Sequence, residues 1–159
     1  MQAQTGYALL MTFVLIGFGF ALFATYETFV PSAEAVCSVN AFISCAKVDN
    51  SGHTSTLGIP DWSIGVAGYA VLLILGIRAF RSWNRNHLLA FTAVSAAGAL
   101  VSLYLAYIEL AVIQGLCPVC LGTYLFNAAA LLTALYLLRL GRSGADDHGS
   151  RTPADAARA

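Results

Sequence analysis

Four long apolar stretches divide this chain and limit the folds open to it. They run over about residues 7–30, 62–80, 87–113 and 118–140, and charged residues lie near their ends. A helix needs about 20 predominantly apolar residues to cross the hydrocarbon core of a bilayer. A soluble domain of 159 residues could not bury a composition that is 58% hydrophobic and only 10% charged. We therefore predict an all-α membrane protein, a bundle of four transmembrane helices.

The first stretch allows a second interpretation, as a secretory signal. The run Ala33-Glu34-Ala35 has the small-x-small form of a cleavage site that follows an apolar segment. However, residues 1–6 contain no Lys or Arg, which the start of a signal carries, and the apolar run is long enough to span a membrane. We expect an uncleaved first helix.

The basic residues predict the orientation of the bundle, because short loops rich in Lys and Arg stay in the cytoplasm. Several flank the connection between the second and third stretches or follow the fourth: Arg78, Arg81, Arg85, Arg139 and Arg142. The outer loop 31–61 and the turn 114–116 contain only Lys47. We therefore expect a multi-pass protein of the cell inner (plasma) membrane, with both termini in the cytoplasm and all four cysteines on the outer face.

The remaining composition sets further limits. Eight basic and eight acidic residues balance, which argues against binding to nucleic acid. After Leu140 the chain turns to Gly, Ser, Asp, Arg and Ala, and Pro153 breaks any helix, so we predict a disordered cytoplasmic tail over 141–159. That tail is too short for a second folded domain. Any soluble redox partner is therefore expected to be a separate chain.

The first chemical motif is Cys117-Pro118-Val119-Cys120, at the start of the fourth stretch. Proline suits the first helical position, so Cys117 is expected at the helix cap, facing N–H groups that favour a charged sulfur. A spacing of three places both sulfurs on one side of the first turn, in reach of a reversible bridge. The alternative is a pair of buried, inert cysteines. The motif favours redox chemistry.

The second pair, Cys37 and Cys45, lies in the outer loop. Apolar residues at roughly helical spacing, Val39, Phe42 and Ile43, suggest a short amphipathic helix over the end of the bundle. A permanent disulfide that staples this loop is one interpretation. A zinc site of all four cysteines is another, although the gap is wide for a zinc knuckle and an oxidising face disfavours it, so we expect no metal. A third is a relay in which two dithiol pairs pass electrons inward by disulfide exchange.

A relay needs an electron acceptor inside the membrane, and a lipid-soluble quinone fits. The sequence contains no Rossmann glycine motif and no haem C-x-x-C-H motif. Candidates to line a quinone pocket near the outer surface are aromatic: Tyr69, Tyr104, Tyr107, Tyr124 and Phe126. Any of these tyrosines could equally belong to an interfacial aromatic belt. Glu27 and Glu109 are expected at helix ends in reach of water, with a role for Glu109 in the pocket as the alternative.

Together these residues resemble the vitamin K epoxide reductase family. The resemblance covers about residues 7–140 and rests on both cysteine pairs, on Ser51, on Leu57-Gly58-Ile59-Pro60 and on Tyr124, four residues after Cys120. It is closest to the prokaryotic branch, without the fused thioredoxin-like domain of many bacterial relatives. Many prokaryotic members look like oxidases that pass electrons from a thioredoxin-like protein to ubiquinone or menaquinone.

The resemblance implies a role for each cysteine. Cys120 would face the quinone with Cys117 as its partner, Cys45 would shuttle to Cys117, and Cys37 would meet a thioredoxin-like protein that acts in trans.

Three further positions follow from the same resemblance. Ser51 occupies the family's loop Ser/Thr position, and Asp61 and Tyr124 fall where members contact the quinone. Asp61 replaces the Asn of the animal proteins.

The expected function is therefore a membrane dithiol:quinone oxidoreductase that supports disulfide bond formation. One alternative keeps the same cysteines and makes vitamin K epoxide the substrate. Another is a membrane scaffold without enzymatic activity, held by static disulfides or by zinc.

Overall fold

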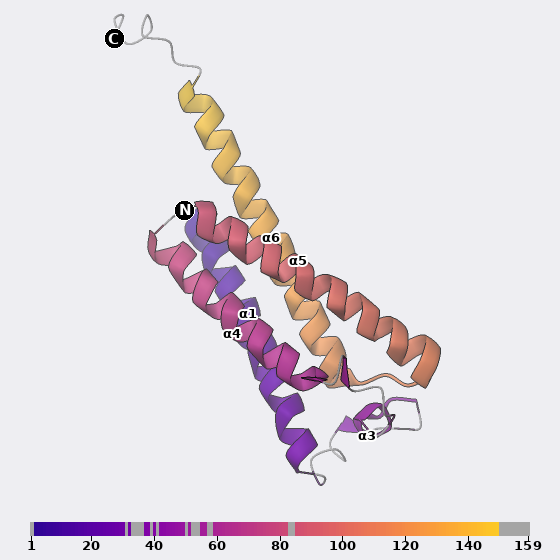
Figure 1. Cartoon of the computed structure of the whole chain (residues 1–159). Helices are drawn as coiled ribbons and strands as arrows, with labels where there is room; N and C mark the ends of the chain where they lie inside the picture. The colour runs from indigo at the N-terminus through magenta and orange to yellow at the C-terminus, as the bar shows by residue number, and fades with distance from the viewer. Residues whose placement is uncertain are drawn as a thin grey trace, which may run out of the picture.

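The computed structural model describes residues 2–30, 32, 37–38, 40, 42–49, 51, 55–56, 59–82 and 85–149. Its long helices are α1 (Gln2–Phe29), α4 (Asp61–Ser82), α5 (Arg85–Tyr107), which continues as the π-helix η1 (Ile108–Ile113), and α6 (Pro118–Gly149). Between α1 and α4 lie the short helix α3 (Cys45–Asp49) and an antiparallel pair of two-residue strands, β1 (Ser55–Thr56) and β2 (Ile59–Pro60). Figure 1 shows the long helices as one antiparallel bundle.

Among the described residues, four helical segments are long and apolar enough to cross a membrane: Gln4–Phe29, Asp61–Arg81, Arg85–Ile113 and Pro118–Leu140. Their outward faces carry large apolar side chains such as Leu100, Leu103 and Leu132, each at least 67% exposed. Such faces suit contact with lipid tails and would be costly in water. The predicted all-α bundle of four membrane helices is confirmed.

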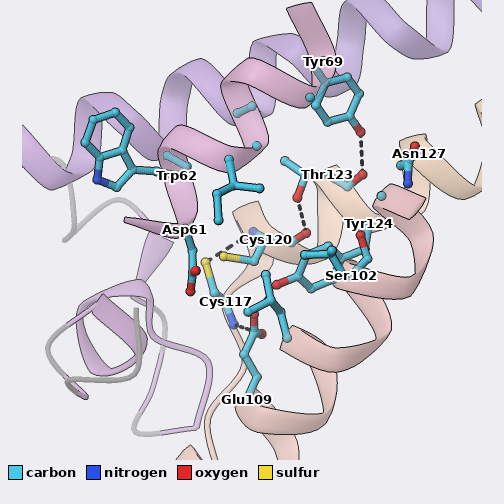
Figure 2. Close-up of a pocket in the computed structure, with 18 of the residues that line it drawn as sticks. Asp61, Trp62, Tyr69, Ser102, Glu109, Cys117, Cys120, Thr123, Tyr124 and Asn127 are labelled. Atoms are coloured by element: carbon cyan, nitrogen blue, oxygen red, sulfur yellow. Dashed lines mark hydrogen bonds between the residues drawn. The ribbon is translucent and has the colours of Figure 1, made fainter. Parts of the chain in front are cut away.

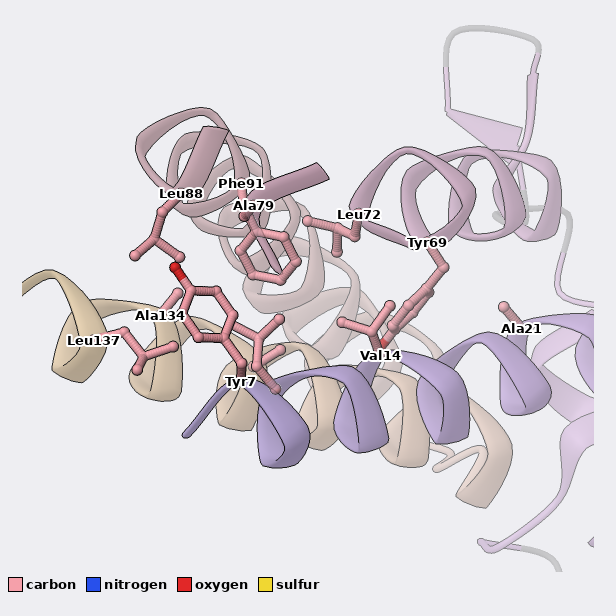
Figure 3. Packing of buried hydrophobic residues seen from close by; sticks show 12 residues of the cluster. Tyr7, Val14, Ala21, Tyr69, Leu72, Ala79, Leu88, Phe91, Ala134 and Leu137 are labelled. Carbon is pink, nitrogen blue, oxygen red and sulfur yellow. The ribbon is translucent and has the colours of Figure 1, made fainter. Parts of the chain in front are cut away.

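The helices pack in a ring, in which α1 and α5 each contact both α4 and α6. Small residues fill the closest contacts: Ala21, Ala79, Ala130 and Ala134 are at most 2% exposed. Figure 3 shows larger side chains, including Phe91 and Leu72, filling the space between the helices. Small residues let helix backbones approach closely, which is a main source of stability in membrane bundles.

Two polar contacts join helices inside this core. Ser95 on α5 donates from Oγ to Asn127 Oδ1 on α6 at 2.9 Å, and Asn127 Nδ2 donates back to the Ser95 carbonyl at 3.2 Å. Tyr69 on α4 donates to the Thr123 carbonyl on α6 at 2.6 Å. Gly17 on α1 makes room for Tyr69, because any side chain at that position would meet the tyrosine ring. These contacts fix α4, α5 and α6 relative to one another.

The two ends of the bundle differ in which helix ends and loops they carry. Helix α1 ends, α4 begins, η1 ends and α6 begins at the end that carries α3, and α1 begins and α6 ends toward the other end (Figure 1). Helix α6 continues to Gly149, whereas the sequence suggested a disordered tail from residue 141. Adding residues to an existing helix carries no nucleation cost, so a polar segment can extend it before Pro153. Residues 150–159 of the predicted tail lie outside the described residues.

Candidate active site

The loop segment 42–44 runs beside the turn that leads into α6. The Leu116 N–H donates to the Phe42 carbonyl at 2.8 Å, and the Ser44 N–H donates to the Leu116 carbonyl at 3.1 Å. Ile43 and Leu116 thereby form a parallel β-bridge. The expected amphipathic helix over Phe42 and Ile43 is wrong, because Phe42 lies in a bend, Ile43 lies in a β-bridge, and the backbone groups of this segment bind the turn. Val39, the third residue of that expectation, lies outside the described residues.

Side chains fix both ends of this segment. Asn40 Oδ1 accepts hydrogen bonds from the N–H groups of Phe42 at 2.9 Å and Ile43 at 2.8 Å, which is an Asx turn. Ser44 Oγ accepts from the Lys47 N–H at 3.2 Å and so caps α3, which begins at Cys45. The Lys47 ammonium then donates to the Gln114 carbonyl at 2.7 Å. Cys45 is therefore held directly against the turn before α6.

The two cysteine pairs meet at this contact. Cys37 and Cys45 form a disulfide with Cα atoms 5.8 Å apart, and Cys117 and Cys120 are both in the thiol form. The Cys45 sulfur lies 3.3 Å from the Cys117 sulfur, although 72 positions separate them in the chain. Cys45 is 1% exposed and Cys117 is 3% exposed. This arrangement allows a disulfide to pass between the pairs by thiol exchange, which a purely static staple would not require.

Cys117 occupies the helix-cap position that the sequence predicts. Helix α6 begins at Pro118, and the Cys120 N–H donates to the Cys117 sulfur at 3.3 Å. A Ser or Asp oxygen takes this place in most helix caps, where it accepts from the N–H three residues on. The positive end of the helix dipole therefore faces the Cys117 sulfur, and both sulfurs of the motif lie on one side of the first turn.

Glu109 binds the turn before α6 with both its side chain and its backbone. Its Oε2 accepts from the Cys117 N–H at 3.3 Å, and its Oε1 accepts from the Tyr124 hydroxyl at 2.8 Å. Its backbone carbonyl also accepts from the Gly115 N–H at 3.0 Å and from the N–H of Gln114, which has a left-handed φ of 51°. Glu109 is only 5% exposed, so the expectation of a water-exposed interfacial residue is wrong. The wide turn of η1 rotates it inward, toward the cysteines.

A second buried carboxylate lies beside the loop disulfide. Glu27, in the last turns of α1, is 2% exposed, and a carboxylate oxygen lies within 4.8 Å of the sulfurs of Cys37 and Cys45. Glu27 is thus buried as well, against the expectation of an interfacial residue. Within the described part of the chain, this trio is the one cluster with the spacing of metal ligands, and its two sulfurs are bonded to each other. The four cysteines do not gather there as one zinc site.

A cavity of about 370 Å³ opens beside the thiols of α6. Helices α1, α4, α5, η1 and α6 all contribute to its mostly apolar wall. Figure 2 shows Asp61 and Trp62 from the start of α4 on one side, and Cys117, Cys120 and Tyr124 on the other. A largely apolar cavity with a few convergent polar groups is the usual form of a small-molecule site.

The predicted ligand residues divide into two groups. Asp61, Tyr69 and Tyr124 line the cavity. By contrast, Tyr104 and Tyr107 are 56% and 65% exposed on the lipid-facing surface, as an aromatic belt would be.

Two further predicted positions lie away from the cavity wall. Phe126 packs against Phe13 and Phe20 of α1. Ser51 does not line the cavity, and its Oγ donates to the Val48 carbonyl at 2.7 Å, at the end of α3.

Sequence reasoning missed Trp62 and gave Glu109 a place in the pocket only as an alternative. Trp62 lines the cavity although the sequence shows it only as the first residue of an apolar stretch. Glu109 carried a usable signal, since a carboxylate within an apolar stretch and eight residues before Cys117 is costly unless it has a role there.

Comparison with known proteins agrees with this geometry. The model of the vitamin K epoxide reductase family matches residues 8–135, a span that contains all four cysteines. The chain is 34% identical over 112 residues to vitamin K epoxide reductase complex subunit 1 of Rattus norvegicus, which covers 62% of this chain and 67% of the rat protein. The same subunit of Mus musculus is 32% identical over the same extent. The prokaryotic branch stays a prediction.

The extent of these matches, the helical bundle and the cysteine pairs lead to one assignment. The chain belongs to the vitamin K epoxide reductase family, as a multi-pass membrane oxidoreductase with a disulfide-forming cysteine pair.

Proposed function

We propose that this protein is a membrane dithiol:quinone oxidoreductase. Electrons enter from a reduced thioredoxin-like protein at Cys37 and Cys45, pass to Cys117 and Cys120, and reduce a quinone in the cavity. The partner leaves with a disulfide, so the reaction supports disulfide bond formation. The observation that carries this proposal is the 3.3 Å approach of the Cys45 and Cys117 sulfurs, with the cavity beside Cys117 and Cys120.

The first half of the reaction is disulfide exchange. A partner thiolate attacks Cys37 and Cys45 leaves; the partner's second thiol then resolves the mixed disulfide, so two electrons have entered the loop pair. Cys45 next attacks Cys117 in the Cys117–Cys120 disulfide, and Cys120 leaves. Cys37 finally attacks Cys45, which releases Cys117 as a thiol and restores the loop disulfide. The arrangement of a loop disulfide with two helix thiols corresponds to the end of this sequence.

The second half reduces the quinone. The two thiols of α6 lose two electrons and two protons as their disulfide forms, and the quinone gains both to become a quinol. The apolar wall, with Trp62 and Tyr124, suits the ring of ubiquinone or menaquinone, and the Tyr124 hydroxyl and Asp61 are the polar groups proposed to contact it.

The proposed orientation places the cysteine end on the extracytoplasmic face of the inner membrane. Support comes from basic residues at the other end of the bundle, where α1 begins: Arg78, Arg81, Arg85 and Arg139. The thioredoxin-like partner then approaches from the outside, in trans.

The test follows quinone absorbance without oxygen after purified protein is mixed with a reduced thioredoxin-like protein. Wild type is expected to form quinol, and Cys120→Ala is expected to form none. If wild type leaves several quinones and the partner unchanged, the proposal is wrong.

A second candidate function is reduction of vitamin K epoxide, which the names of the rat and mouse relatives favour. The same dithiol would give two electrons and two protons to the epoxide, with quinone and water as products. Supplying the epoxide with a small dithiol distinguishes the two. Epoxide turnover without turnover of ubiquinone or menaquinone would make this the better assignment.

A further inference from the structure

We propose that Glu109 is a proton carrier between the helix thiols and the quinone, acting through the Tyr124 hydroxyl. This inference rests on the quinone reduction proposed above and names the path that one of its protons takes. It concerns a residue outside both cysteine pairs and outside the groups that the sequence assigned to the quinone.

The contacts of Glu109 connect the reacting groups directly. One carboxylate oxygen accepts from the Tyr124 hydroxyl at 2.8 Å, and the other accepts from the Cys117 N–H at 3.3 Å. The Cys120 side chain lies near enough to interact with this carboxylate. All four residues line the same cavity. A single carboxylate therefore lies between the helix thiols and a hydroxyl on the wall of the proposed quinone cavity.

Burial favours such a carrier. Glu109 is 5% exposed and Cys117 is 3% exposed, and Cys120 is only partly exposed. Each proton that leaves a thiol needs an acceptor close by, and a carboxylate within hydrogen-bond reach is one. A buried carboxylate inside a membrane helix is also costly, and such residues commonly mark a functional path.

The proton path balances with the electron path. Glu109 takes the Cys120 proton, passes it to Tyr124, and Tyr124 gives its own proton to one quinone oxygen. The Cys117 proton is released into the cavity and taken up by the other quinone oxygen. Two S–H bonds break, one S–S bond and two O–H bonds form, and two electrons move from sulfur to the ring. Glu109 and Tyr124 end in their starting states.

A purely structural role for Glu109 predicts something different. Its carbonyl and carboxylate both bind the turn 114–117, so loss of that role would move Cys117 and slow its exchange with Cys45. Loss of proton transfer alone would leave this exchange unchanged. Glu109→Gln separates the two, because an amide keeps the size of the side chain and an oxygen for the Cys117 N–H but does not carry the proton.

The experiment is a single turnover in lipid nanodiscs. The protein is reduced in advance, mixed with ubiquinone without oxygen, and followed by absorbance in H₂O and in D₂O. We expect Glu109→Gln and Tyr124→Phe each to slow quinol formation by about 100-fold, and the double variant to be no slower than either one. The solvent isotope effect of wild type should fall in both. Tyr104→Phe, the same substitution on the lipid-facing surface, should match wild type.

A second readout measures the thiol states of all four cysteines by mass spectrometry after partner addition. Glu109→Gln should still pass the disulfide between the pairs at the wild-type rate. Wild-type quinol rates in Glu109→Gln, or multiplied losses in the double variant, would overturn the inference while quinone reduction itself stands. Slowed exchange between the pairs would show a structural role instead. If wild type forms no quinol at all, the proposed function fails first.

Discussion

The two cysteine pairs lie close together but differ in what surrounds them. The loop pair is bonded as a disulfide, and hydrogen bonds of the segment 40–47 hold it in place. The helix pair carries thiols at the first turn of α6, beside the cavity. The same chemical group is thus placed once in a loop that packs on the turn before α6 and once beside a cavity inside the bundle. In the proposed function, this difference in position, more than cysteine itself, separates electron entry from electron exit.

The largest expected effect is loss of quinol formation, and for each cysteine pair it depends on which electron donor is supplied. Cys37→Ala should abolish quinol formation driven by a thioredoxin-like partner, because the entry disulfide is lost. The same variant, reduced chemically in advance, should still form quinol in a single turnover, since Cys117 and Cys120 remain. Cys120→Ala should fail in both assays. Quinone absorbance measures each result, and equal loss of both activities in Cys37→Ala would contradict the division of roles.

A smaller effect is expected where the loop is tied to the turn before α6. Lys47→Met removes the hydrogen bond to the Gln114 carbonyl, worth about 0.5–1.5 kcal/mol, and should slow transfer between the pairs several-fold. Quinol formation from chemically reduced protein should stay at the wild-type rate. Arg85→Met, an exposed change at the other end of the bundle, is the matched control. Slowing in both assays would show that Lys47 acts on the fold as a whole.

The cavity wall should respond less to loss of a single tyrosine hydroxyl. Tyr69→Phe removes the hydrogen bond to the Thr123 carbonyl and should lower stability by about 1 kcal/mol, because Thr123 keeps its place in α6. Thermal unfolding in detergent measures this change. Tyr104→Phe serves as control, since its ring is 56% exposed. A loss of quinol formation in Tyr69→Phe without loss of stability would mean that this hydroxyl binds the quinone.

The smallest effect is expected at Ser51. Its hydroxyl binds the Val48 carbonyl, which also accepts from the Ser51 N–H at 3.1 Å, so Ser51→Ala keeps a contact to the same oxygen. Stability should fall by less than about 1 kcal/mol, and partner-driven quinol formation should change little. A loss as large as that of Cys37→Ala would instead place Ser51 in the reaction, as the family resemblance suggests.

Sequence reasoning was strongest where the physical rule is local. Apolar length predicts the four helices, and Pro118 predicts the helix cap at Cys117, because both depend on neighbouring residues. Sequence reasoning was weaker where segments that are distant in the chain contact each other. The extended form of Ile43 depends on its pairing with Leu116, which is distant in the chain.

Glu109 shows a second limit of sequence reasoning. An apolar pattern of period 3.6 does not reveal the π-helix η1, so it does not reveal the inward direction of this carboxylate. Its place beside Cys117 depends on that local widening of the helix. The pattern also does not tell which tyrosines reach the cavity. Tyr124 lines the cavity and Tyr107 faces lipid, although both lie near the cysteines in sequence.

The most direct test of the account is to trap the bond between the two pairs. In a protein with Cys37→Ala and Cys120→Ala together, Cys45 and Cys117 remain, with sulfurs that lie 3.3 Å apart. Mild oxidation followed by peptide mass mapping should find a Cys45–Cys117 disulfide in most molecules. A matched protein with Cys37→Ala and Cys117→Ala should form far less of the Cys45–Cys120 bond. Absence of the Cys45–Cys117 bond in folded protein would contradict transfer between the pairs.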